Sequence, residues 1–152
     1  MAWQNLIYYS FVMWKIKNIR LPKYNYRTNG WYFVTIVTNW RKKYLAGHEN
    51  IIREELSSTI QGVGGVSADT FIIMPDHVHA IFVLHHSTVT LGEFIRKFKA
   101  KVSRRMRLRV WQPNYYEHII RHEEELNRIR EYITNNPMKE LLFPKSDQLN
   151  DQ

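Results

Sequence analysis

The stretch Phe71-Ile-Ile-Met-Pro-Asp-His-Val-His-Ala-Ile-Phe-Val-Leu84 decides the fold of this 152-residue chain. Its two halves are rich in β-branched and aromatic residues, which favour strands, and Pro75-Asp76 between them favours a tight turn. We therefore expect a strand over 71–74, a second strand over 77–84 and a hairpin that joins them.

His77 and His79 are separated by one residue of the second predicted strand. Side chains two positions apart on a strand project from the same face, about 6.5–7 Å apart along the chain. Two neutral imidazoles on one face can bind a divalent cation between them. Two histidines on a half-buried sheet are more often ordinary polar surface, so the metal interpretation depends on the rest of the chain.

The other elements are predicted from hydrophobic periodicity and turn residues. We expect strands over 31–39 and 115–121, helices over 49–61 and 90–108, and a last helix over 123–135 that Pro137 ends. The order β-α-β-β-α-β-α favours an α+β, ferredoxin-like antiparallel sheet with helices packed on one face and the His pair on a central strand. The other face of such a sheet is expected to stay free of helices.

Composition limits the protein's class. Hydrophobic residues make up 44% of the chain, which favours one folded domain, and no apolar run is long enough to span a bilayer. Because the chain has no cysteine, any metal must use His, carboxylate, amide or phosphate ligands. The lack of cysteine also suits a reducing, cytoplasmic location.

Basic residues gather in two stretches of a chain whose net charge is +8. Residues 1–48 hold eight Lys or Arg and no acid, and residues 96–109 hold eight more, again with no acid. Such segregation favours a polyanion-binding surface. A merely solvated helix face is the less favoured alternative, because like charges on one helix repel each other.

The last predicted helix carries Tyr132 and, four residues later, Asn136. Residues at this spacing share a helix face, with Cβ atoms about 5–6 Å apart. Each also has an ordinary structural interpretation: a packed aromatic whose hydroxyl lies at the rim for Tyr132, and a helix C-cap for Asn136.

Four segments together resemble the single-tyrosine HUH transposases, and within them the REP-associated tyrosine transposases. They are Met74-Pro-Asp-His-Val-His79, Leu91-Gly-Glu-Phe-Ile-Arg-Lys-Phe-Lys99, Trp111-Gln-Pro-Asn-Tyr-Tyr-Glu-His-Ile-Ile-Arg121 and Ile129-Arg-Glu-Tyr-Ile-Thr-Asn-Asn-Pro137. Ile19-Arg-Leu-Pro-Lys-Tyr-Asn-Tyr26 is similar to the family's opening. The resemblance covers about residues 19–140, so we expect an extension over 1–18, a transposase domain over 19–145 and a polar tail over 146–152.

The resemblance implies a metal-dependent transesterase that cuts and rejoins single-stranded DNA beside hairpins through a 5′-phosphotyrosine. It makes Tyr132 the nucleophile and His77, His79 and Asn136 ligands of Mg²⁺ or Mn²⁺. Its implied substrates are REP-like hairpins or element-end palindromes, bound by a monomer or a homodimer. The implied phosphate contacts are Arg96, Lys97, Lys99, Lys101, Arg104, Arg105 and Arg107.

Other functions stay open at this point. Tyr115 and Tyr116 are rival nucleophiles, ranked lower because strand alternation points them to opposite faces and neither has an amide one helical turn away. The remaining histidines after the pair are expected to be structural or surface residues. A non-catalytic single-stranded nucleic-acid-binding module, a hydrolase in which water attacks, or an inactive transposase relic would use the same fold.

Overall fold

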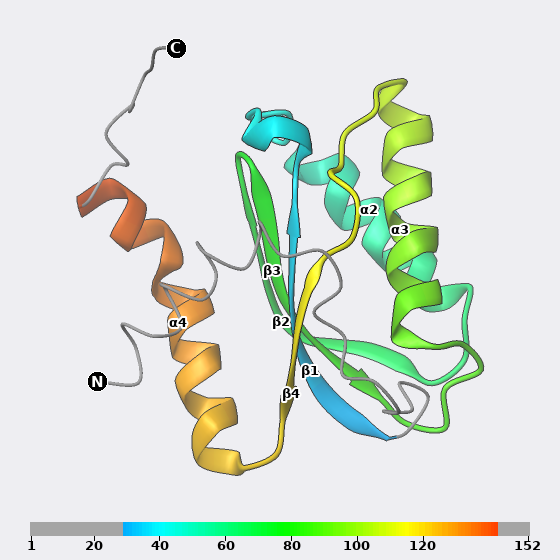
Figure 1. Cartoon of the computed structure of the whole chain (residues 1–152), viewed down its shortest axis with the longest axis vertical. Helices are drawn as coiled ribbons and strands as arrows, with labels where there is room; N and C mark the ends of the chain where they lie inside the picture. Colours follow the sequence, from blue (N-terminus) through cyan, green and yellow to red (C-terminus); the bar gives the residue numbers. More distant parts are fainter. Residues whose placement is uncertain (1–28, 143–152) are drawn as a thin grey trace.

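The computed structural model describes residues 29–142, which form a four-stranded antiparallel sheet with three α-helices (Figure 1). The elements follow the predicted order. They are β1 (Gly30–Val37), the 3-10 turn η2 (Asn39–Arg41), α2 (Glu49–Gln61), β2 (Val66–Met74), β3 (His77–Leu84), α3 (Leu91–Met106), β4 (Tyr116–Ile120) and α4 (Glu123–Leu142). The strand order β2-β3-β1-β4 confirms the ferredoxin-like sheet and puts the His pair on a central strand. The predicted extension over 1–18 and tail over 146–152 lie outside the described residues.

The two faces of the sheet carry different helices. On one face, α2 and α3 pack against Tyr32, Val34 and Phe82, in a core that also holds Phe94 and Phe98. On the other face lies α4 (Figure 1), where Ile129 and Ile133 pack against Phe33 and Ile81. We expected this second face to be free of helices. It is covered because the apolar stripe of α4 needs a surface on which to be buried.

Strand β2 is longer than predicted, since it begins at Val66 rather than at residue 71. A bulge at Asp69 interrupts its pairing with β3: Ala68 lies opposite Phe82, and Thr70 lies opposite the next residue of β3, Ile81. One extra residue shifts the side-chain alternation by one position. Val66 and Ala68 therefore stay on the face of α2 and α3, while Thr70 faces α4.

Helix α3 forms as its sequence predicts. Thr90 and Glu93 make a capping box, in which the Glu93 amide donates to the Thr90 hydroxyl (3.1 Å) and the Thr90 amide donates to the Glu93 carboxylate (2.9 Å). The stripe predicted to face inward is buried, and consists of Leu91, Phe94, Ile95, Phe98 and Val102. Most of the Lys and Arg side chains consequently lie on the outer surface of α3.

Helix α4 corrects one prediction. Pro137 does not end it, because the helix runs on to Leu142. A proline inside a helix removes one backbone hydrogen bond and can kink the helix, but the residues after it can still bond to carbonyls one turn earlier.

Among the described residues, no helix is both long enough and apolar enough to cross a bilayer.

Candidate functional site

The two histidines of β3 lie side by side on the sheet face that α4 covers. Their ring centroids are 4.6 Å apart, and only 5% of His77 and 2% of His79 is exposed. Strand alternation places both rings on one face, as predicted, and Val78 between them packs into the core of the opposite face. The two imidazoles therefore form a buried pair of nitrogen donors.

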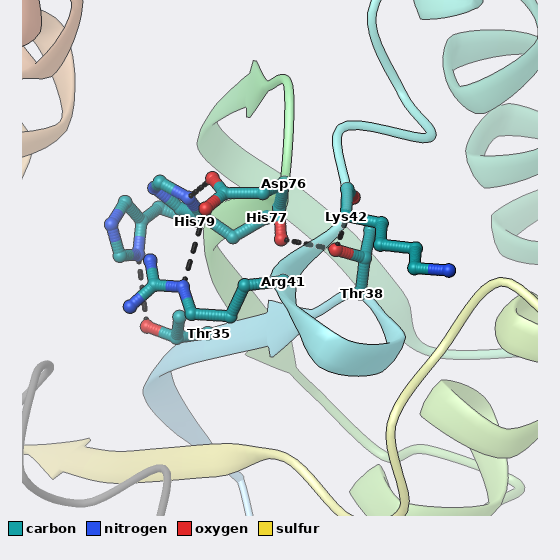
Figure 2. Close-up of polar contacts among 7 residues, drawn as sticks. All are labelled: Thr35, Thr38, Arg41, Lys42, Asp76, His77 and His79. Atoms are coloured by element: carbon teal, nitrogen blue, oxygen red, sulfur yellow. Dashed lines mark hydrogen bonds and ion pairs between the residues drawn. The ribbon is translucent and has the colours of Figure 1, made fainter. Parts of the chain in front are cut away.

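Each imidazole is oriented by a neighbour (Figure 2). His77 Nδ1 donates to Asp76 Oδ1 at 2.6 Å, and His79 Nδ1 lies 2.9 Å from Thr35 Oγ1 on β1, directly across the strand pair. A carboxylate can only accept, so the proton of neutral His77 sits on Nδ1 and the lone pair on Nε2. Metal-binding histidines in proteins are commonly oriented in this way by a carboxylate, carbonyl or water.

Asp76 also contacts the turn after β1. Arg41 Nε donates to Asp76 Oδ2 at 3.2 Å, while Oδ1 of the same carboxylate accepts from His77 (Figure 2). The carboxylate therefore joins an arginine of the turn to a histidine of the pair. Asp76 lies in the tight β2–β3 turn, so its backbone is fixed by the hairpin.

Tyr132 of α4 reaches the same face, and Asn136 follows it one helical turn later. The Tyr132 ring meets the His79 ring edge-on with centroids 5.5 Å apart, and it meets Phe33 in the same way at 6.2 Å. Tyr132 is 4% exposed and Asn136 is 7% exposed. Asn136 lies inside the helix, one turn after Tyr132, and is not its cap. The structure thus brings the tyrosine and the His pair together in one small region.

An ion pair fixes α4 on the sheet. Arg130 donates from two nitrogens to the Asp69 carboxylate, at 2.8 and 2.7 Å, and its guanidinium lies 5.6 Å from the centre of the Trp31 ring. The hydrogen bond from Arg130 lowers the pKa of Asp69 below its ordinary value, against the opposing effect of burial. The bulge residue of β2 is therefore one anchor for the helix that carries Tyr132.

The candidate donors for a metal are the two adjacent imidazoles, and Asn136, one helical turn after Tyr132 on α4, is the predicted third donor. Within residues 29–142, no three His, Asp or Glu side chains gather into a cluster that could bind a metal by themselves. The fixed tautomer of His77 nevertheless suits a cation, because it leaves the Nε2 lone pair as the donor. An amide oxygen and a substrate phosphate oxygen are ligands that Mg²⁺ and Mn²⁺ prefer, and imidazole is a ligand of divalent transition-metal ions.

The rival tyrosines separate as predicted. Tyr115 packs with the core under α2 and α3, whereas Tyr116 lies across from Thr35 on the α4 face, with its ring 6.1 Å from Phe33. Tyr116 is thus on the same face as the His pair. His85 and His86 are exposed beyond the end of β3, and His118 bonds to Glu125.

The seven predicted phosphate contacts lie on or just after α3, across the sheet from the His pair, and they are not equivalent. Arg96, Lys97, Arg104 and Arg107 are exposed. Arg105 forms ion pairs with Glu54 and Glu55 of α2, and Lys101 donates to the Ser58 hydroxyl at 3.0 Å.

Lys99 is half-buried and bonds to the segment that follows α3. Its ammonium donates to the carbonyls of Gln112 (2.8 Å) and Asn114 (2.7 Å), and burial lowers its pKa from 10.5 to about 8. It lines a pocket of about 640 Å³ between α3 and residues 109–115, to which Arg96 and Arg109 also contribute. Of the seven predicted contacts, Lys99 is therefore the one whose charge is least available to a phosphate.

Residues 26–136 of the chain match the family model described as transposase, IS200 like. The chain belongs to this transposase family. Over 161 aligned residues, the transposase is 34% identical to an uncharacterized protein of Haemophilus influenzae, covering 80% of this chain and 88% of that one. Over 118 residues it is 23% identical to a REP-associated tyrosine transposase of Escherichia coli K12, covering 77% and 71% of the two chains.

The fold of this transposase is also found in a solved structure. A REP-associated tyrosine transposase bound to a REP hairpin superposes with a TM-score of 0.70 at 22% identity, covering 82% of this chain and 74% of that one. At this identity the likeness shows the fold. The resemblance drawn from the sequence motifs is thus confirmed.

Several residues that shape the site in this transposase were not predicted. Asp76 could have been found, because a carboxylate directly before a candidate ligand histidine is a recognisable local pattern. Thr35 and Asp69 could not, since their contacts depend on how distant segments pair. Thr35 meets His79 across 44 positions of sequence, and Asp69 meets Arg130 across 61.

Proposed function

We propose that this transposase is a metal-dependent single-stranded DNA transesterase that cleaves and rejoins DNA beside hairpins, with Tyr132 as nucleophile. The observation that carries the proposal is the meeting of Tyr132 with the His77–His79 pair, from α4 and β3, on one sheet face. A tyrosine whose ring contacts one of two adjacent, oriented imidazoles can supply the nucleophile for covalent phosphodiester exchange at a metal held by those imidazoles.

His77, His79 and Asn136 are the proposed ligands of a divalent cation, Mg²⁺ or Mn²⁺. When bound, the cation neutralises charge on the scissile phosphate and orients it for in-line attack. The chain's part is to present the lone pairs: Asp76 accepts the Nδ1 proton of His77, and Thr35 lies within hydrogen-bond distance of the corresponding atom of His79.

Tyr132 performs the exchange itself. Its phenol oxygen bonds to the phosphorus while the bond between that phosphorus and the 3′-oxygen of the preceding nucleotide breaks. The phenol gives up its proton and the leaving 3′-oxygen takes one up, so the products are a 5′-phosphotyrosine and a free 3′-hydroxyl. One phosphate ester replaces another, so the step is roughly energy-neutral and reversible without ATP. A free phenol has a pKa near 10, so Tyr132 must be deprotonated during attack.

The proposed substrate is a single-stranded hairpin, such as a REP-like sequence or an element-end palindrome. Support comes from the basic surface of α3 and from the solved relative, which is bound to a REP hairpin. The exposed cations Arg96, Lys97, Arg104 and Arg107 are the proposed main phosphate contacts, with Lys101, Arg105 and Lys99 in lesser roles.

The deciding experiment looks for a covalent adduct. Single-stranded hairpins from the chain's own genomic neighbourhood, labelled at either end, are incubated with the protein and Mn²⁺, Mg²⁺ or a chelator, and run on a denaturing protein gel. Tyr132→Phe is compared with Tyr116→Phe, the matched control on the same face. We expect an adduct that carries the 3′-side fragment, needs metal, survives Tyr116→Phe and disappears in Tyr132→Phe.

The other outcomes choose between alternatives. Binding without any adduct would favour a non-catalytic module or an inactive relic. Cleavage that persists in Tyr132→Phe but is lost in Tyr116→Phe would make Tyr116 the nucleophile. Cleavage that persists in both variants would mean that water attacks.

A further inference from the structure

Trp40 is the most exposed large hydrophobic side chain in the part of the chain that the structure describes. It is 82% exposed, whereas the next such residue, Leu108, is 39% exposed. Tryptophan is highly buried on average, because its large ring gains most from leaving water. A ring held almost wholly in water is accessible to a ligand, and the conformation and neighbours of Trp40 indicate which kind.

The backbone holds this ring outward in an unusual conformation. Trp40 and Arg41 both have positive φ, 57° and 51°, a region that bulky residues rarely adopt. The turn is held in place around them: the Asn39 amide donates to the Val110 carbonyl (2.7 Å), and Thr38 Oγ1 reaches the carbonyl oxygens of Lys42 (2.6 Å) and Asp76 (3.0 Å) (Figure 2). Strained conformations that the surroundings enforce cluster at functional sites.

The turn is joined directly to the candidate site. Arg41, the residue after Trp40, contacts Asp76, and Asp76 contacts His77. Figure 2 shows these side chains in one continuous line from the turn to the His pair. The turn that carries Trp40 is thus linked through Arg41 and Asp76 to the proposed ligand His77.

The surroundings of the ring are cationic. Lys42 and Lys43 beside it are exposed, and residues 38–43 include no acid. At the same end of the molecule lies the C-terminal end of α3 (Figure 1), with the exposed Arg104 and Arg107.

The position of the turn suits a strand that passes between the two sheet faces. Helix α3 covers one face and the His pair lies on the other, so DNA that touches both must go round the sheet. Residues 110–112, which follow α3, pair with the end of β1: Thr38 bridges to Trp111, and the Gln112 amide donates to the Val37 carbonyl. The Trp40 turn lies between these residues and Asp76, on the route from α3 to the site.

We propose that Trp40 is a stacking platform for an unpaired base of the single-stranded DNA, and that Lys42 and Lys43 hold the phosphates beside that base. The inference rests on the proposed function and adds the point at which the strand turns toward the His pair. A single flat ring among cations suits a base between phosphates, because stacking accepts any base. A protein or lipid surface would need a wider apolar patch.

The test separates stacking from charge. A fluorescein-labelled oligodeoxythymidylate of about 12 nucleotides, within the site size of known single-strand grooves, is compared with an abasic strand of equal length. Binding is measured by anisotropy for the full-length wild type, Trp40→Phe, Trp40→Leu and Trp40→Ala. Leu108→Ala is the matched control, since it removes an exposed apolar side chain from the same end of the molecule.

We expect Trp40→Ala and Trp40→Leu to weaken oligothymidylate binding roughly 5- to 150-fold, the range for loss of one stacked base. Trp40→Phe, which keeps a ring, should retain most of the affinity, and Leu108→Ala should match the wild type. The abasic strand should bind all variants alike. Equal affinities of Trp40→Phe and Trp40→Leu, or equal losses on the abasic strand, would overturn the proposal.

The Trp40 proposal and the proposed function can fail separately. A wild type that forms the Tyr132 adduct while Trp40→Ala binds normally would remove only the stacking platform. If the wild type binds oligothymidylate through Trp40 but never forms an adduct, only the transesterase fails. Because Trp40 is exposed, its replacement should leave the fold intact, and the Phe–Leu comparison holds even if the Ala variant is unstable.

Discussion

Arg130 on α4 clamps the carboxylate of Asp69 on β2, with Nε 2.8 Å from Oδ2 and Nη2 2.7 Å from Oδ1. The pair joins the helix that carries Tyr132 to an edge strand of the sheet, and does so two residues before the tyrosine. Two parallel hydrogen bonds fix orientation as well as distance. The clamp therefore fixes, relative to β2, the helix turn that carries Tyr132.

Loss of this clamp should slow catalysis more than it weakens DNA binding. We expect Arg130→Met to reduce the rate of adduct formation about 10- to 100-fold, because small misplacements of a reacting group cost this much. Hairpin affinity should change little, since Arg130 is engaged with Asp69. Single-turnover adduct formation and equilibrium binding measure the two effects separately.

Arg128→Met is the matched control, because Arg128 is exposed on the same helix. The double variant Asp69→Arg with Arg130→Asp should recover part of the rate, as a positioning role requires. Equal slowing by Arg128→Met, or a wild-type rate in Arg130→Met, would show that the clamp does not position Tyr132.

The same pair should make stability depend on acid pH. The hydrogen bond from Arg130 holds the pKa of Asp69 below its ordinary value of 3.8, so in this range the unfolded chain binds more protons than the folded one. The contribution of the pair to stability is complete above pH 3.8 and disappears as pH falls through the lowered folded-state pKa. Wild type should exceed Asp69→Asn by about 0.5–1 kcal/mol at neutral pH, since the pair is partly exposed. Thermal unfolding at several pH values should show the two converging in acid, and a gap that widens there would contradict this account.

Local signals explain why so much of the fold could be predicted. The limits of α2 and β3 agree with the prediction at both ends, because apolar spacing and the flanking turn residues specify them within a few positions. The start of β2 was missed because Ser67 and Asp69 break the alternation, and only pairing with β3 shows that a bulge restores it. The continuation of α4 past Pro137 was missed because we took proline to end the helix, whereas here the loss of one hydrogen bond at Pro137 does not end it.

The candidate site divides in the same way. That His77 and His79 share a face follows from the period of a strand, and that Tyr132 and Asn136 share one follows from the period of a helix. Sequence reasoning could not put α4 on the face of the His pair, since that depends on which apolar surface the other helices leave open. Neither could it find Thr35 beside His79, because strand register is set by the whole sheet.

Lys99 should give the protein a stability change at alkaline pH. Burial lowers the pKa of Lys99 from 10.5 to about 8, so the folded chain binds fewer protons than the unfolded chain between these values. Stability then rises with pH across this window, because the cost of keeping a buried ammonium charged is removed. Relative to Lys99→Met, wild type should gain about 1–2 kcal/mol between pH 8 and 10.5. Denaturant unfolding across the window measures this. Lys97→Met, which alters an exposed cation of the same helix and keeps Lys99, should gain stability with pH as the wild type does.

The cations of α3 should contribute unequally to the salt dependence of DNA binding. Each phosphate contact on a single strand adds about 0.7 to the slope of log affinity against log salt. We expect the triple variant of Arg96, Lys97 and Arg104 to Gln to lower the slope by about 2. The double variant Lys99→Met with Arg105→Gln should lower it by well under 1, since these side chains are engaged with carbonyls and with Glu54 and Glu55. Titrations of DNA binding in rising salt measure these slopes. An equal loss of slope per cation in the two variants would mean that Lys99 and Arg105 leave their protein partners and contact phosphates when DNA binds.

Trp40→Gly should make the protein more stable and a poorer DNA binder at once. The φ of 57° at Trp40 suits glycine, whereas in a residue with a Cβ this conformation costs about 1–2 kcal/mol of steric strain. Part of the stability gained by relieving this strain is lost again, because glycine loses more backbone entropy on folding than tryptophan does. Because the ring is 82% exposed, its removal costs little packing. We expect a net gain of about 0.5–1 kcal/mol in the free energy of unfolding, measured by denaturant titration, together with the loss of oligothymidylate affinity. Leu108→Gly, at an exposed residue without positive φ, should bring no such gain. A Trp40→Gly protein less stable than wild type would mean that the ring supports the turn. The exposed position of Trp40 would then be explained by stability and not by DNA binding.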